Sequence, residues 1–261
     1  MEVIKFNLGG RSAFFKKPEV NSYLYFTYGN IHRLALLGIF GAILGYKGYN
    51  QMDFLKRYKK DFKEIAEKRE YEYPEFYSKL KHLKIAIIPK EVNIGKKVQV
   101  FNNSVGYASK EQGGNLIIKE QWLENPSWDI YVAIQDREGK KLAKALTERN
   151  FVYIPYLGKN DHLADITEIT LIKDANEVNA FNNIHSLILK DDFKIVEDDD
   201  LDDDLEGEAI TIFKYEEKLP DGLEEKTNKY EFKSFIFTNA NLKKVNEVRV
   251  YRAEDRNIVF I

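Results

Sequence analysis

A short basic and aromatic segment near the start of the chain has the residue types that hold single-stranded RNA. In residues 8–18 (LGGRSAFFKKP) the cations Arg11, Lys16 and Lys17 are interleaved with Phe14 and Phe15. Lysine and arginine neutralise phosphates, while an aromatic ring stacks on an unpaired base. Successive side chains of an extended segment point to opposite sides, so at most one ring faces a ligand, and we assign that role to Phe14. The alternative is a core phenylalanine beside solvated lysines.

A second candidate site lies at the start of an apolar helix that we expect over residues 31–45. Asn30 can cap this helix, and His32 and Arg33 follow directly. A helix start offers free N–H groups and the positive end of the helix dipole, which suit a phosphate. Tyr28, Asn30, His32 and Arg33 are therefore candidate nucleic-acid ligands, although capping and packing alone would also explain them.

Catalytic and metal-binding motifs are missing from the sequence. It contains no GxxxxGK[ST], HExxH or GxSxG motif and no cysteine, and no two of its four histidines have metal-ligand spacing. The acidic run at residues 197–208 has Asp203 where a calcium loop requires glycine, so we expect an exposed loop there, with a weak cation site or a docking tail as alternatives. We expect no catalytic residue, no metal and no cofactor.

Charge is unevenly distributed along the chain. Residues 1–100 carry 19 Lys/Arg and 10 Asp/Glu, a net charge of +9, so a total of −2 leaves −11 for the rest. A basic N-terminal part suggests a polyanion-binding face.

The sequence also predicts a cytoplasmic protein. The absence of cysteine fits a reducing cytoplasm, and no signal peptide is visible. The apolar run at residues 34–44 is too short for a membrane span, which needs roughly 20 residues.

The order of the expected elements predicts a fold. Strands are expected at residues 2–8, 84–88, 128–134 and 151–155, with helices at 31–45, 51–69 and 138–149. Apolar residues at 54, 58, 62 and 65 make the second helix amphipathic. This is the β-α-β-β-α-β order of a ferredoxin-like, RRM-like α+β domain, here spanning residues 1–156.

Two further segments complete the expected architecture. Residues 89–127 are inserted between the second and third strands and read as a projecting β-hairpin that carries Lys96 and Lys97. Residues 157–261 read as an antiparallel β-rich region containing the acidic loop, with a turn at Asp221-Gly222.

Three motifs resemble those of a known family. They are Gly10-x-x-Ala13-x-Phe15-Lys16-Lys17-Pro18, residues 28–45 (YGNIHRLALLGIFGAILG) and residues 155–160 (PYLGKN). Together they resemble the CRISPR-associated Cas-five family of the RAMP superfamily, and most closely its type I-B members. The chain departs from the family at Lys16, where many members have arginine, and at residues 31–33, where many have Pro-Pro-Arg.

The resemblance implies a role. A family member is a non-catalytic subunit of a Cascade surveillance complex, where it holds the crRNA 5′ handle, caps the backbone filament beside the backbone and large subunits, and presses a thumb hairpin on the RNA. On this view Arg11, Lys16, Lys17, His32 and Arg33 contact the handle, Lys96 and Lys97 belong to the thumb, and Lys159 lies in the third motif.

Two other functions stay open. In one CRISPR subtype the same family cuts precursor crRNA without a metal, and Tyr28, His32 and Lys47 are the residues that could act as acid and base here. A polyanion-binding domain unrelated to CRISPR is the third reading.

Overall fold

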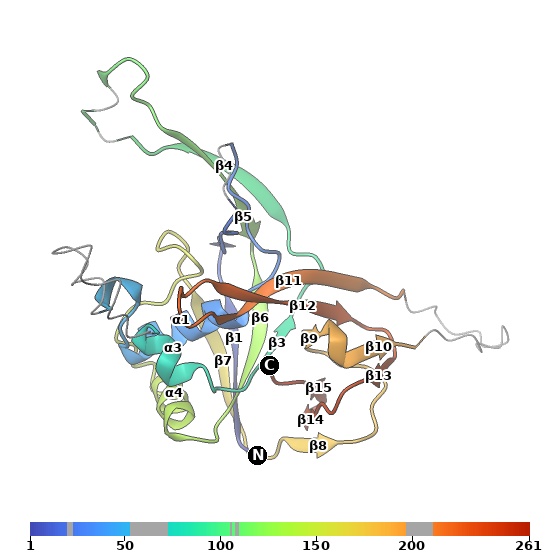
Figure 1. The fold of residues 1–261 in the computed structure, drawn as a ribbon. Coiled ribbons are helices and arrows are strands. Elements are labelled where there is room, and N and C mark those ends of the chain that lie inside the picture. Colours follow the sequence, from blue (N-terminus) through green and yellow to red (C-terminus); the bar gives the residue numbers. More distant parts are fainter. Residues whose placement is uncertain (20–22, 53–72, 105, 108–109, 197–210) are drawn as a thin grey trace.

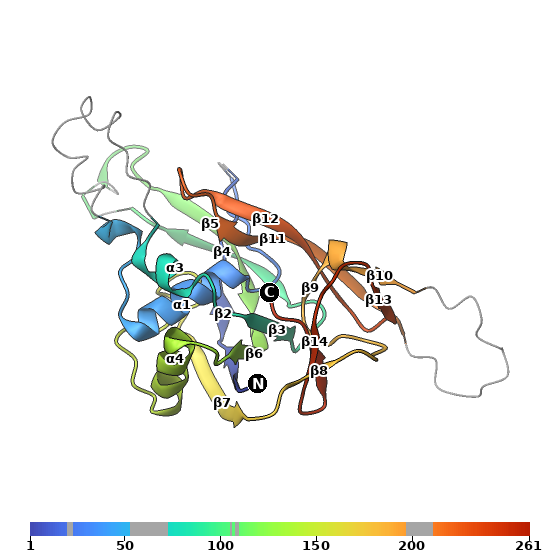
Figure 2. The ribbon, with the colours of Figure 1, turned by 60° about the horizontal axis from the view of Figure 1, so that its bottom comes forward.

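The chain folds into antiparallel sheets covered by a few helices. The structure is a computed structural model, and it describes residues 1–19, 23–52, 73–104, 106–107, 110–196 and 211–261. Figures 1 and 2 show a body of sheets and helices from which one long hairpin projects. This mixed, mostly antiparallel architecture agrees with the predicted α+β class.

A four-stranded antiparallel sheet forms the centre of the fold. Its strand order is β3-β6-β1-β7, and the strands are β1 (Val3–Gly9), β3 (Ile85–Pro89), β6 (Ser127–Ala133) and β7 (Asp165–Ile172). The period of two in β1 buries Ile4, Phe6 and Leu8 on one face, as the alternation predicted.

Both faces of this sheet are covered. The face that carries Phe6 packs against α1 (Arg33–Leu44), where the Phe6 and Phe40 ring centroids lie 6.2 Å apart, and the same core includes α3 (Glu75–Leu80) and α4 (Arg137–Thr147). The opposite face, which carries Val3 and Tyr131, packs against β14 (Val250–Ala253) and β15 (Arg256–Ile258). Burial on both sides explains why β3 is apolar at every position.

The fourth strand of the sheet is not the one that the sequence predicted. Residues 151–155 form no strand, and β7, past the predicted boundary at residue 156, pairs with β1 instead. The 151–155 segment instead runs beside the C-terminal end of α1, with the backbone N–H of Val152 donating to the carbonyl of Ile43 at 3.0 Å. The prediction was wrong because an apolar, β-branched run can also lie against the end of a helix without entering a sheet.

The inserted segment is an antiparallel hairpin, as predicted. Its strands are β4 (Lys96–Asn102) and β5 (Ile117–Glu124), and it projects from the body in Figure 1. At its base β5 also pairs with β2 (Ser12–Ala13) and with residues 23–27, where the Tyr25 N–H donates to the Lys119 carbonyl at 2.9 Å. The base of the hairpin is therefore built on the basic N-terminal segment.

Short strands and one long ribbon make up the rest of the chain. The ribbon pairs β11 (Lys214–Leu223) with β12 (Tyr230–Thr238), and the predicted turn at Asp221-Gly222 was wrong, because both residues lie within β11 beside a bulge. The remaining elements are β8 (Asn176–Val178), β9 (Ile188–Leu189), β10 (Phe193–Ile195), β13 (Leu242–Lys244) and the 3₁₀ turns η1 (Tyr49–Gln51) and η3 (Lys190–Asp192).

Two sequence predictions fall on residues that the structure does not describe. These are most of the amphipathic helix expected at 51–69 and the acidic run at 197–208. Among the helices that are described, none is both long enough and apolar enough to span a membrane.

Candidate nucleic-acid interface

The start of α1 is fixed by two polar side chains whose roles differ from those predicted. His32, not Asn30, is the N-cap: its Nδ1 accepts a hydrogen bond from the Ala35 N–H at 3.2 Å. Asn30 is buried, and its Oδ1 accepts the indole N–H of Trp128 at 2.9 Å. Asn30 therefore anchors the loop before α1 to the central sheet and is not available to a ligand.

The three motifs found in the sequence meet at one place in the fold. The Tyr28 N–H donates to the Phe15 carbonyl at 2.9 Å, and the Phe14 N–H donates to the Leu157 carbonyl at 3.0 Å. Gly158 lies so close to the first motif that a Cβ would overlap the Phe14 carbonyl oxygen, and its φ of +91° is one that side chains rarely adopt. Segments as far apart in the chain as Phe14 and Leu157 thus form one surface.

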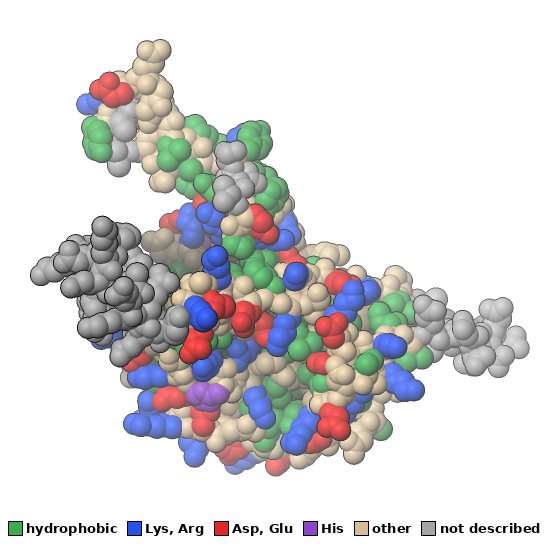
Figure 3. Space-filling model, in the orientation of Figure 1, with side chains coloured by type: hydrophobic (Ala, Val, Ile, Leu, Met, Phe, Trp, Pro, Cys, Tyr) green, Lys and Arg blue, Asp and Glu red, His purple; other side chains and the backbone are tan. Residues whose placement is uncertain are grey.

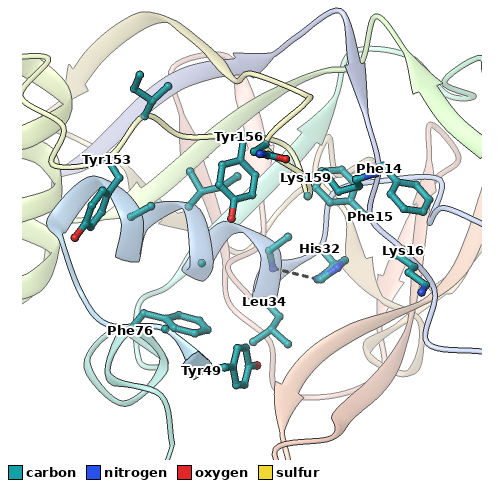
Figure 4. Close-up of a pocket in the computed structure, with 18 of the residues that line it drawn as sticks. Phe14, Phe15, Lys16, His32, Leu34, Tyr49, Phe76, Tyr153, Tyr156 and Lys159 are labelled. Atoms are coloured by element: carbon teal, nitrogen blue, oxygen red, sulfur yellow. Dashed lines mark hydrogen bonds between the residues drawn. The ribbon is translucent and has the colours of Figure 1, made fainter. Parts of the chain in front are cut away.

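A groove of about 1240 Å³ runs along this surface beside α1. Figure 4 shows Lys16, Phe14, Phe15 and His32 toward one end, and Tyr153 and Phe76 toward the other. Of the predicted RNA ligands, Phe14, Lys16, His32 and Lys159 line the groove, whereas Arg11, Lys17, Tyr28, Asn30, Arg33, Lys96 and Lys97 do not.

Both phenylalanines of the first motif are buried. Phe15 packs edge-on against His32 and Trp128, with ring centroids 6.0 Å away from each. Phe14 lies under Lys159, whose Nζ is 5.8 Å from the ring centroid. The expectation that the two rings point to opposite sides of an extended segment is wrong, because both buried rings line the same groove.

The predicted lysines differ in how far carboxylates neutralise them. Lys17 pairs with Glu217 at 3.2 Å, Lys97 with Glu124 at 3.2 Å, and Lys159 with Glu120 at 3.1 Å. Lys16 is exposed, its Nζ lies 4.1 Å from the Tyr25 ring centroid, and no carboxylate among the described residues pairs with it. Of the two lysines that line the groove, Lys16 and Lys159, a phosphate therefore reaches Lys16 without displacing a carboxylate.

Arg33 is bound within the protein. Its guanidinium donates to the carbonyls of Lys81, of Leu83 at 3.2 Å and of Asp221 at 3.3 Å. Burial lowers the pKa of Arg33, and the neighbouring Asp221 carboxylate opposes that shift. These contacts join α1 to the start of β3 and to β11, so the geometry gives Arg33 a structural role in place of the predicted phosphate contact.

The ionisation of His32 and Tyr28 is set by burial. Burial lowers the pKa of His32 to about 3 and raises the pKa of Tyr28 above its ordinary value. The two ring centroids are 5.3 Å apart, and the Tyr28 hydroxyl has no hydrogen-bond partner within the described residues. At neutral pH both groups are uncharged.

The other predicted cations gather at the base of the hairpin. The backbone of Arg11 accepts a hydrogen bond from the Asn125 N–H at 3.0 Å, Lys96 pairs across the strands with Leu123, and Lys97 reaches Glu124. Arg11 and Lys96 are exposed. They form a second basic group, separate from the groove lining.

Sequence reasoning missed the aromatic residues that complete the groove. Tyr49, Tyr153, Tyr156 and Tyr230 line it from three different parts of the chain. Only Tyr156 could have been found from the sequence, because it lies inside the third motif. No group of three or more His, Asp or Glu residues in the described part of the chain could hold a metal ion.

Comparisons with known proteins give distant structural likenesses. No family model and no curated protein matches the sequence. Among solved structures, a chain of a CRISPR RNA-guided surveillance complex has a TM-score of 0.48 at 13% identity, covering 93% of this chain and 91% of that one. A CRISPR protein from Archaeoglobus fulgidus has a TM-score of 0.48 at 10% identity and covers 99% of both chains. A chain of the type III-B Cmr-beta complex bound to target RNA has a TM-score of 0.44 at 11% identity, covering 94% of this chain and 86% of that one.

Proposed function

We propose that the chain is a non-catalytic crRNA-binding subunit of a type I CRISPR surveillance complex. The observation that carries the proposal is the convergence of the three motifs on one groove, where Lys16 and Lys159 lie beside a row of aromatic side chains. Cations together with aromatic faces are what single-stranded nucleic acid requires. The ligand that the motif resemblance favours is the crRNA 5′ handle.

The fold supports the proposal at a coarser level. The central sheet order β3-β6-β1-β7, with α1 after β1 and α4 after β6, is the arrangement that we assign to a ferredoxin-like domain. The projecting hairpin β4–β5, with exposed Lys96 at its base, supports the assignment of a thumb. Such a hairpin would lie against the neighbouring backbone subunit of the complex.

The candidate acid–base residues are arranged unfavourably for RNA cleavage. A histidine whose pKa is about 3 is a weak base at neutral pH, and the His32 Nδ1 is already used by the helix cap. Lys47 lies beyond the other end of α1, and 12 helical residues span about 18 Å. These positions support a binding function over catalysis.

A salt titration of RNA binding tests the proposal. Binding of a crRNA with its repeat-derived 5′ handle would be measured for the purified chain and for Lys16→Ala. Loss of one phosphate contact is expected to weaken binding and to reduce the slope of log K against log salt by about 0.7. Lys144→Ala, on the exposed surface of α4, is the matched control and should leave both quantities unchanged. Equal slopes for Lys16→Ala and the unaltered chain would reject the phosphate contact.

Incubation of the protein with repeat RNA in EDTA tests the non-catalytic part. We expect the RNA to stay intact. Site-specific cleavage that His32→Ala abolishes would instead show a metal-independent endoribonuclease.

A further inference from the structure

The groove has a second, apolar half along α1 that the phosphate contacts leave unexplained. Its floor is made of small residues, and a Cβ placed on Gly38 would meet no atom within 4 Å. A glycine inside a helix costs about 1 kcal/mol relative to alanine. Gly41 has a packing reason, because a Cβ there would press on the Cβ of Phe76 at 2.5 Å, and Gly45 ends the helix with a φ of +76°. Gly38 has neither reason and leaves the helix backbone open to the groove.

The walls of this half are apolar, and most of them face solvent. Val152, Tyr153 and Ile154 on one side are 60%, 57% and 74% exposed, and half-exposed Tyr49 stands on the other side beside buried Phe76. Figure 4 shows Tyr153 and Tyr156 on one side of α1 and Phe76 and Tyr49 on the opposite side. Contiguous exposed apolar surface of this kind marks a binding site.

The charges along the groove suit a polyanion. Lys16 and Lys159 are its cations, and Glu120 is the one carboxylate in its described lining. Glu120 already accepts hydrogen bonds from Lys159 at 3.1 Å and from the Trp122 indole at 2.9 Å. A polyanion lying along the groove therefore meets no free carboxylate.

We propose that the apolar half of the groove binds unpaired bases of the RNA whose phosphate contacts Lys16. This inference rests on the proposed function and adds what the groove recognises. Tyrosine rings offer planes for base stacking and hydroxyls for the base edges, and the open backbone at Gly38 lets a flat ring approach the helix. At about 1240 Å³ the groove exceeds the roughly 300–1,000 Å³ of pockets for single small ligands, which leaves room for more than one base.

Gly38→Leu is the variant that tests this inference. Its side chain would project into open space and raise helix propensity, so the fold should be at least as stable as before, which thermal unfolding would check. Handle RNA is expected to bind roughly tenfold or more weakly, because the loss of even one stacked base has an effect of that size. The salt slope should stay unchanged, because the phosphate contacts remain. Lys144→Leu adds the same side chain on the exposed surface of α4 and should leave RNA affinity unaltered.

Abasic substitutions locate the bases. RNAs that lack one handle base at a time would be bound to the unaltered chain and to Gly38→Leu. At the nucleotide that enters the groove, removing the base and introducing Gly38→Leu remove the same contact, so their effects on the binding free energy should not add. At nucleotides bound elsewhere the two effects should add. Additive effects at every handle position would overturn the inference.

The remaining outcomes separate this inference from the proposed function. If Lys16→Ala weakens RNA binding and Gly38→Leu does not, the groove floor holds no base, while RNA binding stands. If Gly38→Leu leaves RNA affinity intact but abolishes co-purification with other subunits, the groove holds an apolar protein segment instead. If the unaltered chain binds no RNA, the proposed function fails, and the inference fails with it.

Discussion

At the residue scale, charge alone does not identify a ligand-binding side chain. Lys17, Lys97 and Lys159 are each paired with a glutamate, and Arg33 is occupied by backbone carbonyls. Lys16 differs because no carboxylate among the described residues pairs with it. The partners of each cation decide its role, and the sequence shows none of these long-range partners.

Arg33→Ala tests the structural role of this side chain. Three carbonyls would lose their donor, and we expect the free energy of unfolding to fall by about 2–3 kcal/mol. Chemical denaturation measures this, with Arg249→Ala at an exposed position expected to change stability by less than about 0.5 kcal/mol. An unchanged unfolding midpoint together with a reduced salt slope of RNA binding would make Arg33 a phosphate ligand after all.

His32 makes stability depend on pH in a definite direction. Its pKa is about 3 in the folded chain against an ordinary 6.5, so below pH 6.5 the unfolded state takes up a proton that the folded state refuses. The free energy of unfolding should therefore fall as the pH is lowered from 6.5 toward 3. Burial lowers the pKa of His162 and His185 as well, so these residues contribute in the same direction.

His32→Asn isolates the contribution of His32. Asparagine keeps an N-cap acceptor and does not titrate. The free energy of unfolding of His32→Asn should therefore decline less between pH 7.5 and pH 5 than that of the unaltered chain. Denaturation at the two pH values gives the comparison. The same decline in both proteins would show that His32 is protonated in the folded chain at pH 5.

At the element scale, the contact between the third motif and the segment that follows β2 holds the groove together. Gly158 has a φ of +91° and no room for a Cβ against the Phe14 carbonyl. Gly158→Ala should lower the free energy of unfolding by more than about 1 kcal/mol and weaken RNA binding, because Lys159 and Phe14 lose their relative positions.

Gly48→Ala is the matched control for stability, because a Cβ on Gly48 would meet no atom within 4 Å. Its expected effect on stability is within about 0.5 kcal/mol. If Gly158→Ala unfolds with the same free energy as the unaltered chain, the turn at Gly158 can move away from Phe14 without loss of stability.

The elements also show where sequence patterns stop being informative. The positions of β1, β3, β6, α1 and α4 follow from apolar patterning along the chain, and the structure confirms them, although His32 and not the predicted Asn30 caps α1. The sequence analysis missed β7 because this strand contains a bulge. Its pairing with β1 shifts register between Lys5 and Asn7, and Glu168 in β7 has a positive φ of 52°. The bulge places Ile166, Ile169 and Ile172 three residues apart, so the strand loses its period of two.

The candidate site was predictable in part for the same reason. Phe14, Lys16 and His32 lie in local motifs, and the structure brings them to the groove. The residues at 152–154 resembled a strand, because apolar, β-branched composition indicates contact with other apolar groups without saying which ones. Tyr49 and Tyr230 join the groove through long-range packing that leaves no local signal.

At the scale of the whole molecule, Lys and Arg side chains are interspersed with Asp and Glu on the face that Figure 3 presents. One hydrophobic core contains residues from both sides of position 156, among them Phe6, Leu157, Leu187 and Phe235. The proposed RNA contacts rest on the groove beside α1, whose lining comes from both sides of this position.

Photo-crosslinking of a handle-containing crRNA to the intact chain tests the central claim most directly. A photoreactive base would replace each handle nucleotide in turn, and mass spectrometry would identify the attached peptides. We predict crosslinks to peptides that contain residues 14–16 and 153–159, and their loss in Gly38→Leu. Crosslinks confined to other surfaces, or equal crosslinking of an RNA without the handle, would contradict the claim that this groove holds the crRNA 5′ handle.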